Sequence, residues 1–378
     1  MSVRALEFYA GIGGLHLALQ RSSVHGSVVQ AFDWDRVACQ VYRINHSPDI
    51  IKNTDISKLS VTQLANFNAD LWLLSPACQP YTVLNPNAKG ATDPRARSFL
   101  YLVQDILPQL AKMNALPSRL LVENVAGFES PPSLGKTSFT RQTLVSAMRS
   151  LGYRTLELLL TPLQFGVPNS RLRYYFLAKK DPLRFAHTGK EDIDRIWRHI
   201  PGQGEDWIDD RFDDSKERNR VHIPTLNSYL DTPAETADYY PIPDKVLFKW
   251  GSLFDVIYPS SCRSCCFTRG YTQLVRGAGS ILQMNEDLDT TTVFDEFAVA
   301  RPDNPDAVRI LDPLRLRYFS PEELLRLFGF NPRIDSLEPA YFKWPDTKVV
   351  RLRSQYRLIG NSVNVTVVQA LIEYLFIE

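Results

Sequence analysis

One cysteine stands in the chain where a nucleophile would be useful. Cys78 lies in the segment Ser75–Pro80, SPACQP, directly after the apolar run 71–74. Such a run predicts a buried strand, and loops at the carboxyl ends of strands carry the ligand-binding residues of open α/β sheets. A thiol placed there can attack an electron-poor carbon, although a free cysteine more often serves as a small buried hydrophobic residue. For Cys78 alone, both interpretations stay open.

Two further polar motifs are tied to apolar runs in the same way. Glu123 directly follows the apolar run 120–122, which places its carboxyl group at the same predicted sheet edge. Arg171 and Arg173 open a later strand with a spacing of two, so both guanidinium groups face one side of it. They could bind a phosphate or a base edge, or form surface salt bridges. The arrival of all these groups in order on one sheet edge is hard to attribute to chance.

A glycine-rich turn, Tyr9 to Gly14, lies between the first predicted strand and the first predicted helix. Glycines there let the backbone approach a ligand and expose amides at a helix N-terminus. A dinucleotide fingerprint would have glycine at position 16, and His16 in its place argues against NAD. Asp33 ends the second predicted strand, where an acid commonly binds ribose hydroxyls, and Trp34 could stack on an adenine. The alternative is an N-cap aspartate beside a core tryptophan.

Strands and helices alternate through the first half of the chain. Apolar runs predict strands at 3–9, 28–32, 71–74, 120–122, 156–160 and 173–178. Helical periodicity lies between them at 13–21, 34–45, 98–113 and 142–151. This alternation predicts an α/β fold with a doubly wound, mostly parallel sheet that is covered on both faces.

The pattern changes after residue 180. Residues 205–214 are acidic, 224–243 contain four prolines, and 284–313 are polar, which predicts irregular structure. Helical periodicity returns at 321–328 and 363–376. We therefore divide the chain into a domain at 1–182, an irregular insertion at 183–315, and a return at 316–378 that completes the first domain.

Composition limits the possible classes of protein. The chain has 378 residues, 44% of them hydrophobic and 22% charged, with a net charge of +1, so local arginine clusters would have to bind any polyanion. Five cysteines make a poor disulfide framework for this length and fit a reducing compartment. We find no apolar window of about 18 residues. We expect a cytoplasmic or nuclear monomer that neither is exported nor enters a membrane.

The motifs together resemble those of a known enzyme family, the cytosine-5 methyltransferases. The motif series consists, in order, of Tyr9–Gly14, Pro76–Gln79, Glu123–Val125, Arg171–Arg173 and Gly360–Val363. The resemblance covers about the first 180 and roughly the last 60 residues. It implies a Rossmann-like fold that binds S-adenosylmethionine and releases S-adenosylhomocysteine, with the insertion as a smaller target-recognition domain.

The insertion narrows the resemblance to one branch of the family. Cys266–Thr268, Tyr271 and Gly277–Ser280 are similar to the signature of the tRNA-aspartate methyltransferases, which look like DNA methyltransferases but act on the tRNA anticodon loop. This implies a tRNA, tRNA-Asp in particular, as the partner. DNA methylation by the same residues is the second hypothesis, and a catalytically silent nucleic-acid-binding relative is the third.

The resemblance also implies roles for individual residues. Cys78 would add to C6 of cytosine as a thiolate, a protonated Glu123 would assist at N3, and Arg171 and Arg173 would complete the catalytic group. The two arginines and helix amides could raise the thiolate fraction of Cys78. The base that removes the C5 proton is not identified by the sequence.

Binding residues follow from the same resemblance. The implied cofactor residues are Tyr9, Gly11, Ile12, Gly13, Gly14, Asp33, Trp34, Asp55, Ile56, Ser75, Asn361, Ser362 and Val363. The implied substrate residues are Gln79, Lys89, Arg95, Thr268, Arg269 and Tyr271. By itself, Asp55 would be interpreted as an N-cap and Gly360–Asn361 as a turn.

Two features depart from the simplest interpretation. Most members of the family have proline before the nucleophile, whereas this chain has Ala77, which leaves the loop backbone less restricted. The cluster of Cys262, Cys265 and Cys266 invites a zinc site, but no second ligand pair follows at short spacing. We therefore expect no metal.

Overall fold

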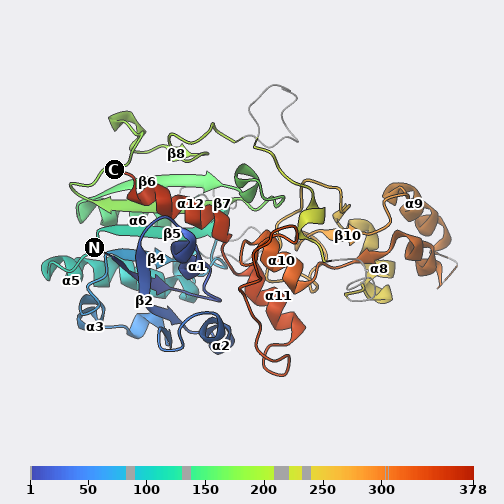
Figure 1. Ribbon diagram of the computed structural model, residues 1–378, viewed down its shortest axis with the longest axis horizontal. Helices are drawn as coiled ribbons and strands as arrows, with labels where there is room; N and C mark the ends of the chain where they lie inside the picture. Colours follow the sequence, from blue (N-terminus) through green and yellow to red (C-terminus); the bar gives the residue numbers. More distant parts are fainter. Residues whose placement is uncertain are drawn as a thin grey trace.

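The computed structural model describes residues 2–81, 90–129, 138–207, 221–231, 240–302, 304 and 306–378. Figure 1 shows a large sheet flanked by helices on one side of the molecule and a smaller body with α8, α9 and β10 on the other. The two chain ends lie on the side of the large sheet.

The large sheet has eight strands in the order β3-β2-β1-β4-β5-β7-β6-β8. Their bounds are β1 Val3–Phe8, β2 Gly26–Asp33, β3 Ile51–Asn53, β4 Leu71–Leu74, β5 Arg119–Val125, β6 Tyr153–Leu160, β7 Arg173–Lys180 and β8 Ile196–Trp197. All neighbours pair in parallel except β7, which is antiparallel to both β5 and β6. The predicted doubly wound, mostly parallel α/β fold is confirmed, with β3 and β8 as additional short edge strands.

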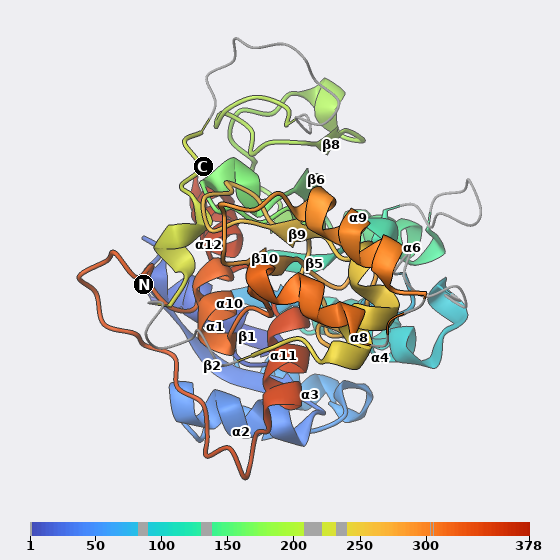
Figure 2. The ribbon, with the colours of Figure 1, turned by 90° about the vertical axis from the view of Figure 1, so that its right-hand side faces the viewer.

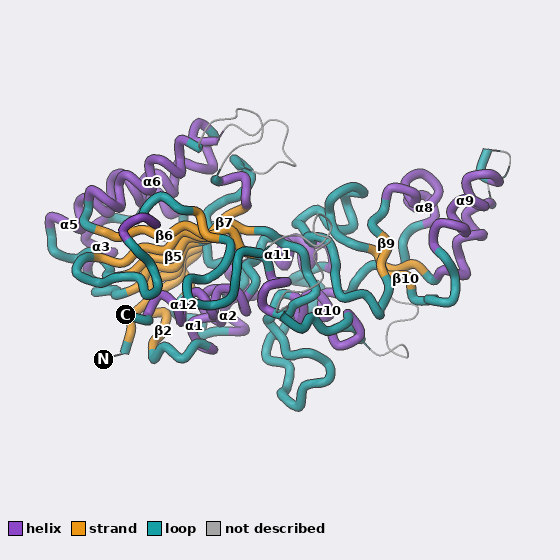
Figure 3. The backbone as a smooth tube through the Cα atoms, turned by 90° about the horizontal axis from the view of Figure 1, so that it is seen from above, coloured by secondary structure: helices purple, strands orange, loops and turns teal. Residues whose placement is uncertain are grey.

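Helices cover both faces of this sheet, because its strands are apolar on both sides. One face packs against α1 (Gly14–Arg21), α2 (Arg36–Asn45) and α12 (Val365–Phe376). The other packs against α3 (Val61–Ala65), α4 (Arg97–Tyr101), α5 (Leu107–Lys112) and α6 (Phe139–Ser150). The two layers are visible on opposite sides of the strands in Figure 3. The predicted helix 98–113 corresponds to α4 and α5 joined by a π-helical stretch, Leu102–Ile106.

The insertion is more regular than its polar, proline-containing sequence predicts. It contains β9 (Val256–Ile257) and β10 (Ile281–Gln283), which form a small sheet with β11 (Leu316–Arg317), and the helices α8 (Asp244–Trp250) and α9 (Thr290–Ala300). Figure 2 shows this part facing the viewer. The interpretation of residues 284–313 as irregular is wrong for α9. This helix begins with a threonine run, which disfavours helix. Asp289 caps it, because its carboxyl group accepts a hydrogen bond from Thr292 N at 2.8 Å.

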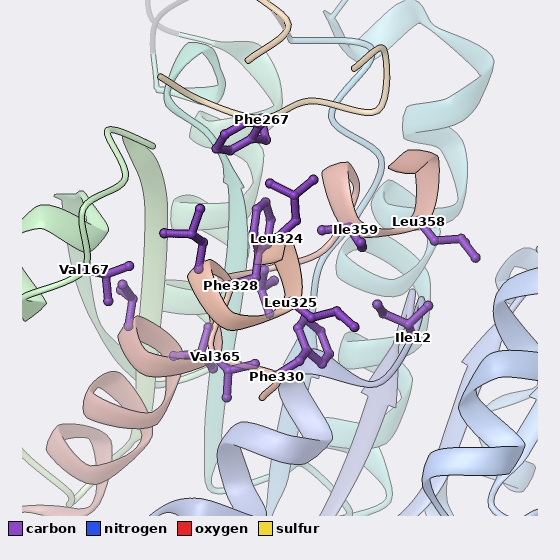
Figure 4. Packing of buried hydrophobic residues seen from close by; sticks show 14 of the residues in the cluster. Ile12, Val167, Phe267, Leu324, Leu325, Phe328, Phe330, Leu358, Ile359 and Val365 are labelled. Carbon is purple, nitrogen blue, oxygen red and sulfur yellow. The ribbon is translucent and has the colours of Figure 1, made fainter. Parts of the chain in front are cut away.

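The segment after the insertion connects the two parts through a shared apolar core. Helices α10 (Pro321–Leu327) and α11 (Leu352–Gly360) lie between the insertion and the large sheet, and α12 packs on the sheet beside α1. Figure 4 shows the packing cluster, which includes Phe267, Leu324, Phe328, Ile359 and Ile12. Contrary to the expectation that no apolar window of about 18 residues occurs, Leu352–Phe376 is long and apolar enough to cross a membrane by composition. This stretch comprises α11 and α12, and 61% of its 18-residue apolar window is buried within this fold.

A buried ion pair fastens β11 to α10. Arg317 donates to both carboxyl oxygens of Glu323 at 2.8 Å, and the same carboxyl accepts from the backbone amides of Ser320 and Asp231 at 2.7 and 3.0 Å. Both charged side chains are almost fully buried.

We expect Glu323→Ala to lower the free energy of unfolding by about 3–5 kcal/mol, because it leaves the Arg317 guanidinium buried without a counter-charge. Arg154→Ala, which removes an exposed ion pair with Asp181, should cost at most about 1 kcal/mol. Urea denaturation of the two variants measures the difference, and equal losses would contradict this account.

Candidate active site at the carboxyl ends of the strands

The strand order brings the predicted catalytic groups together. Cys78 lies in the loop after β4, Glu123 lies within β5, and Arg173 opens β7, and these three strands are neighbours in the sheet. Because β7 is antiparallel to β5, Arg173 pairs with Val125 and its side chain reaches Glu123, with 3.4 Å between Nε and Oε1. Glu123 is therefore inside its strand, whereas the sequence placed it just beyond the strand end.

Two hydrogen bonds fix the cysteine loop to its neighbours. The Asn124 side chain donates to the carbonyl of Pro76 at 3.1 Å, and the Ser75 hydroxyl donates to the carbonyl of Tyr9 at 2.9 Å. The loop is thus tied to β5 on one side and to the glycine turn on the other. Asn124 was not singled out from the sequence, although it stands in the motif that contains Glu123.

Burial raises the pKa of both groups that would act on a substrate. Desolvation raises the pKa of the Glu123 carboxyl above its usual value, against the opposing charges of Arg173 and Arg171. Desolvation also raises the pKa of the Cys78 thiol, again against Arg173. Both arginines lower the pKa of Cys78, as the sequence indicated, but burial outweighs their charge and the net shift is upward. A raised pKa favours the protonated carboxyl, which is the form that a general acid needs.

The two arginines face the same side, as their spacing predicted, but they have different partners. Arg171 is buried, and it donates to the carbonyls of Phe267 and Ser362 at 2.7 Å and of Gly360 at 3.2 Å. Arg173 instead faces Glu123. Arg171 thereby connects the insertion to the segment before α12.

Cys266 lies between these two guanidinium groups. Its sulfur is 3.5 Å from a nitrogen of Arg171 and 3.5 Å from a nitrogen of Arg173. Burial raises the pKa of this thiol, but the two positive charges outweigh burial and lower it overall. The sequence placed Cys266 in a cysteine cluster and in the motif that resembles the tRNA-aspartate branch, without a partner. All five cysteines are free, and no group of three or more potential metal ligands occurs among the described residues.

A small cleft lies beside the glycine turn. Its walls are formed by Tyr9, Ala10, Gly11, Gly14, Leu15, Ser75, Asn361, Ser362 and Val363. Gly11 has a φ of +54°, and the space where a side chain would begin is open. Gly13 has a φ of +90°, and a Cβ there would overlap the His46 ring. The absence of a side chain at Gly13 therefore allows His46 to pack against the turn. Ile12 is buried in the core and does not line the cleft.

The other predicted cofactor residues differ in burial and in their hydrogen-bond partners. Asp33 is buried and accepts from the backbone amides of Gly11 at 2.8 Å and Asp35 at 2.7 Å. Trp34 is 76% exposed, which rules out the alternative of a core tryptophan. Asp55 caps the short helix that begins at the buried Ile56, accepting from Ser57 N at 2.9 Å, so its N-cap role is confirmed. A wider hollow of about 480 Å³ lies next to this helix, between Ser57 and Tyr101.

The predicted substrate residues differ in how exposed their side chains are. Gln79, Thr268 and Arg269 lie near the cysteine loop and the Cys266 segment with side chains at least partly accessible. Arg95 pairs with Asp93 at 2.6 Å. Lys89 lies outside the described residues. Tyr271 is wrong as a substrate contact: it is buried, and its hydroxyl donates to the Ser280 carbonyl and accepts from Phe319 N, both at 2.9 Å.

Comparisons with known proteins identify the family of the chain. Residues 3–376 match the model of the family described as C-5 cytosine-specific DNA methylase. The chain is 37% identical to a tRNA (cytosine(38)-C(5))-methyltransferase of Schizosaccharomyces pombe, over 99% of this chain and 96% of that protein. It is 34% identical to a DNA (cytosine-5)-methyltransferase of Dictyostelium discoideum, over 99% and 94%. The crystal structure of a Spodoptera frugiperda DNMT2 mutant aligns over the whole of both chains with a TM-score of 0.78 and 31% identity.

The close approach of Gly360 to the insertion predicts an unusual effect of alanine. A Cβ at Gly360 would overlap the carbonyl carbon of Thr268 and the backbone nitrogen of Arg269. Glycine to alanine normally stabilises a helix by about 0.5–1 kcal/mol, but here we expect a loss of about 1–3 kcal/mol, because backbone atoms must move apart.

Chemical denaturation tests this prediction. Ser354→Ala, at a partly exposed position of the same helix, serves as the control and should change stability little. A Gly360→Ala protein as stable as the wild type would show that the two segments separate without cost.

Proposed function

Because the chain belongs to the C-5 cytosine-specific DNA methylase family, we propose that it transfers a methyl group from S-adenosylmethionine to C5 of a cytosine in a tRNA anticodon loop, that of tRNA-Asp in particular. The observation that carries the proposal is the convergence of a thiol loop, a buried carboxyl group and a guanidinium group from three neighbouring strands. We further propose that the protein acts as a monomer in the cytoplasm or nucleus, where its free cysteines stay reduced.

The chemistry requires that cytosine C5 become a nucleophile. Addition of the Cys78 thiolate to C6 breaks the C5–C6 double bond and moves electron density toward C5. Glu123 donates its proton to N3 and offsets the negative charge that the addition creates, a type of assistance worth about 10²–10⁴-fold. After methylation, a base removes the C5 proton, the C5–C6 double bond forms again as Cys78 leaves as a thiolate, and N3 returns its proton to Glu123. Two arginines complete the catalytic group. Arg173 faces Glu123, and Arg171 binds the backbone carbonyls of Phe267 and Ser362.

We place the proposed S-adenosylmethionine site at the cleft beside the glycine turn. When bound, this cofactor supplies an electrophilic methyl group on a sulfonium. Tyr9, Gly11, Gly14, Ser75 and Asn361–Val363 would form the walls of the site. The open space at Gly11 and the exposed Trp34 ring suit backbone approach and adenine stacking. Asp33 would hold the ribose, while Asp55 and Ile56 would frame the adenine through the short helix that they begin. Ile12 and Gly13 would shape the turn from behind.

A tRNA substrate is favoured over DNA by the insertion and by the relatives. The Cys266–Thr268 segment touches both arginines through Cys266, so it is part of the site. Relatives that match nearly the whole chain are named tRNA (cytosine(38)-C(5))-methyltransferases, although the Dictyostelium relative is named for DNA. A base in an anticodon loop is already unpaired, which lowers the free energy needed to bring it to a buried thiol. Gln79, Lys89, Arg95, Thr268 and Arg269 are proposed to contact the RNA.

Methyl transfer to tRNA-Asp and to duplex DNA, assayed side by side with labelled S-adenosylmethionine, tests the proposal. We expect the tRNA to be methylated and the DNA to be almost inert, and Cys78→Ala to abolish turnover while it leaves cofactor binding nearly intact. Efficient turnover of DNA with an inert tRNA would overturn the choice of substrate. A protein that binds tRNA but never forms a covalent adduct with a 5-fluorocytosine tRNA would support a silent relative instead.

The position of Arg173 makes a prediction about pH. Arg173 is the largest charge that lowers the pKa of the Cys78 thiol, so Arg173→Met should raise that pKa further. The thiolate forms as pH rises through the pKa, and the rising limb of the single-turnover rate should therefore move to higher pH. If the thiol pKa rises by about one, the rate near neutral pH should fall on the order of tenfold, because the thiolate fraction falls by that factor.

Arg154→Met changes an exposed arginine at the opposite end of the sheet and should leave the pH profile in place. If the rate of Arg173→Met rises with pH over the same range as the wild-type rate, Arg173 does not act on the thiol.

A further inference from the structure

Two residues that the sequence left unexplained meet beneath the glycine turn. Glu7 puts a carboxyl group into the apolar strand β1, and His16 stands where a dinucleotide-binding turn would have glycine. Both are buried, and the hydroxyl of the buried Tyr42 bridges them, 2.8 Å from Glu7 Oε2 and 2.6 Å from His16 Nδ1. A fully buried polar chain of this kind is costly unless each member has a partner.

The hydrogen-bonded set of Glu7, Tyr42 and His16 is attached directly to the start of α1. The N-cap residue of α1 is Gly13, which has no side chain to accept from the free backbone amides of the first turn. Glu7 performs that role from β1, because its Oε1 accepts from the backbone amide of His16 at 3.2 Å. The first turn of α1 is therefore capped from inside the core.

His46 extends the contact to the turn itself. Its ring stacks on His16 with 4.0 Å between centroids, and its Nε2 occupies the space next to Gly13. Burial lowers the pKa of His16 to about 3 and of His46 to about 4, so both rings are uncharged at neutral pH. Gly14 and Leu15, which follow Gly13, line the cleft on its other side.

We infer that Tyr42, by joining Glu7 to His16, is a positioning residue that holds the glycine turn in the shape needed for cofactor binding. The inference rests on the proposed use of S-adenosylmethionine at this cleft. Tyr42 lines no part of the cleft and so acts through the turn. Loss of its hydroxyl leaves a buried carboxyl and a buried imidazole without their shared partner, and the first turn of α1 can relax.

The test is the affinity for S-adenosylhomocysteine, measured by calorimetry on the full-length protein. Tyr42→Phe should raise Kd about tenfold, because an unpaired buried polar group disfavours the binding-competent turn. At saturating cofactor, kcat should change less than twofold, since Cys78, Glu123 and Arg173 are untouched.

Tyr153→Phe is the matched control. Tyr153 is also a buried tyrosine, and its hydroxyl donates to the Pro117 carbonyl at 2.5 Å, but it packs against the other face of the sheet, with α6 and not with α1. It should lose comparable thermal stability without a change in Kd. If both variants bind the probe like the wild type, or if both weaken equally, Tyr42 has only a structural role and the inference is overturned. A wild-type protein that fails to bind S-adenosylhomocysteine would overturn the proposed function itself.

Discussion

Two guanidinium groups, Arg171 and Arg173, lie side by side in the interior, and the site is organised around this constraint. Like charges in a buried position repel each other and have lost their hydration, so each needs partners nearby. Arg171 has three main-chain carbonyls, Arg173 has the Glu123 carboxyl, and the Cys266 sulfur lies between both. These partners come from β5, from the insertion and from the segment before α12. The contacts that stabilise the two arginines therefore hold together parts of the chain that are far apart in sequence.

The same burial sets the chemistry of the site. Without substrate, desolvation raises the pKa values of Cys78 and Glu123, while the thiol in direct contact with the arginines is the one whose pKa is lowered. The charge of Arg173 thus lowers the pKa values of both thiols, Cys78 and Cys266. A raised pKa is useful for Glu123, which must carry a proton to act as an acid, and it makes the thiolate of Cys78 depend on the charge of Arg173.

Local patterns predicted the elements well where periodicity and apolar runs were strong, and less well where tertiary contacts compensate for poor local signals. Helix α9 forms although it begins with three threonines, because Asp289 caps it and Phe297 packs into the core. Tyr271 was interpreted as a surface contact within a recognition motif, yet its ring and hydroxyl fill an interior site between β10 and the residues before α10. Asp55 caps the short helix that follows it, as its local sequence indicated. For α9 and Tyr271, burial decided the outcome, and burial is not a local property.

The sequence by itself determined the alternation of strands and helices and the order of the motifs along the chain. Since carboxyl ends of parallel strands share one edge, those two facts were sufficient to place Cys78, Glu123 and the glycine turn at the same edge of the sheet. Only the tertiary structure decided that Arg171 holds main-chain carbonyls while Arg173 faces the carboxyl group, and that Cys266 joins them. It alone revealed that Glu7, within the apolar strand β1, and His16, where a dinucleotide-binding turn would have glycine, share the hydroxyl of Tyr42. Side-chain partners depend on which strands become neighbours and on what each buried charge needs, and neither is encoded within a single segment.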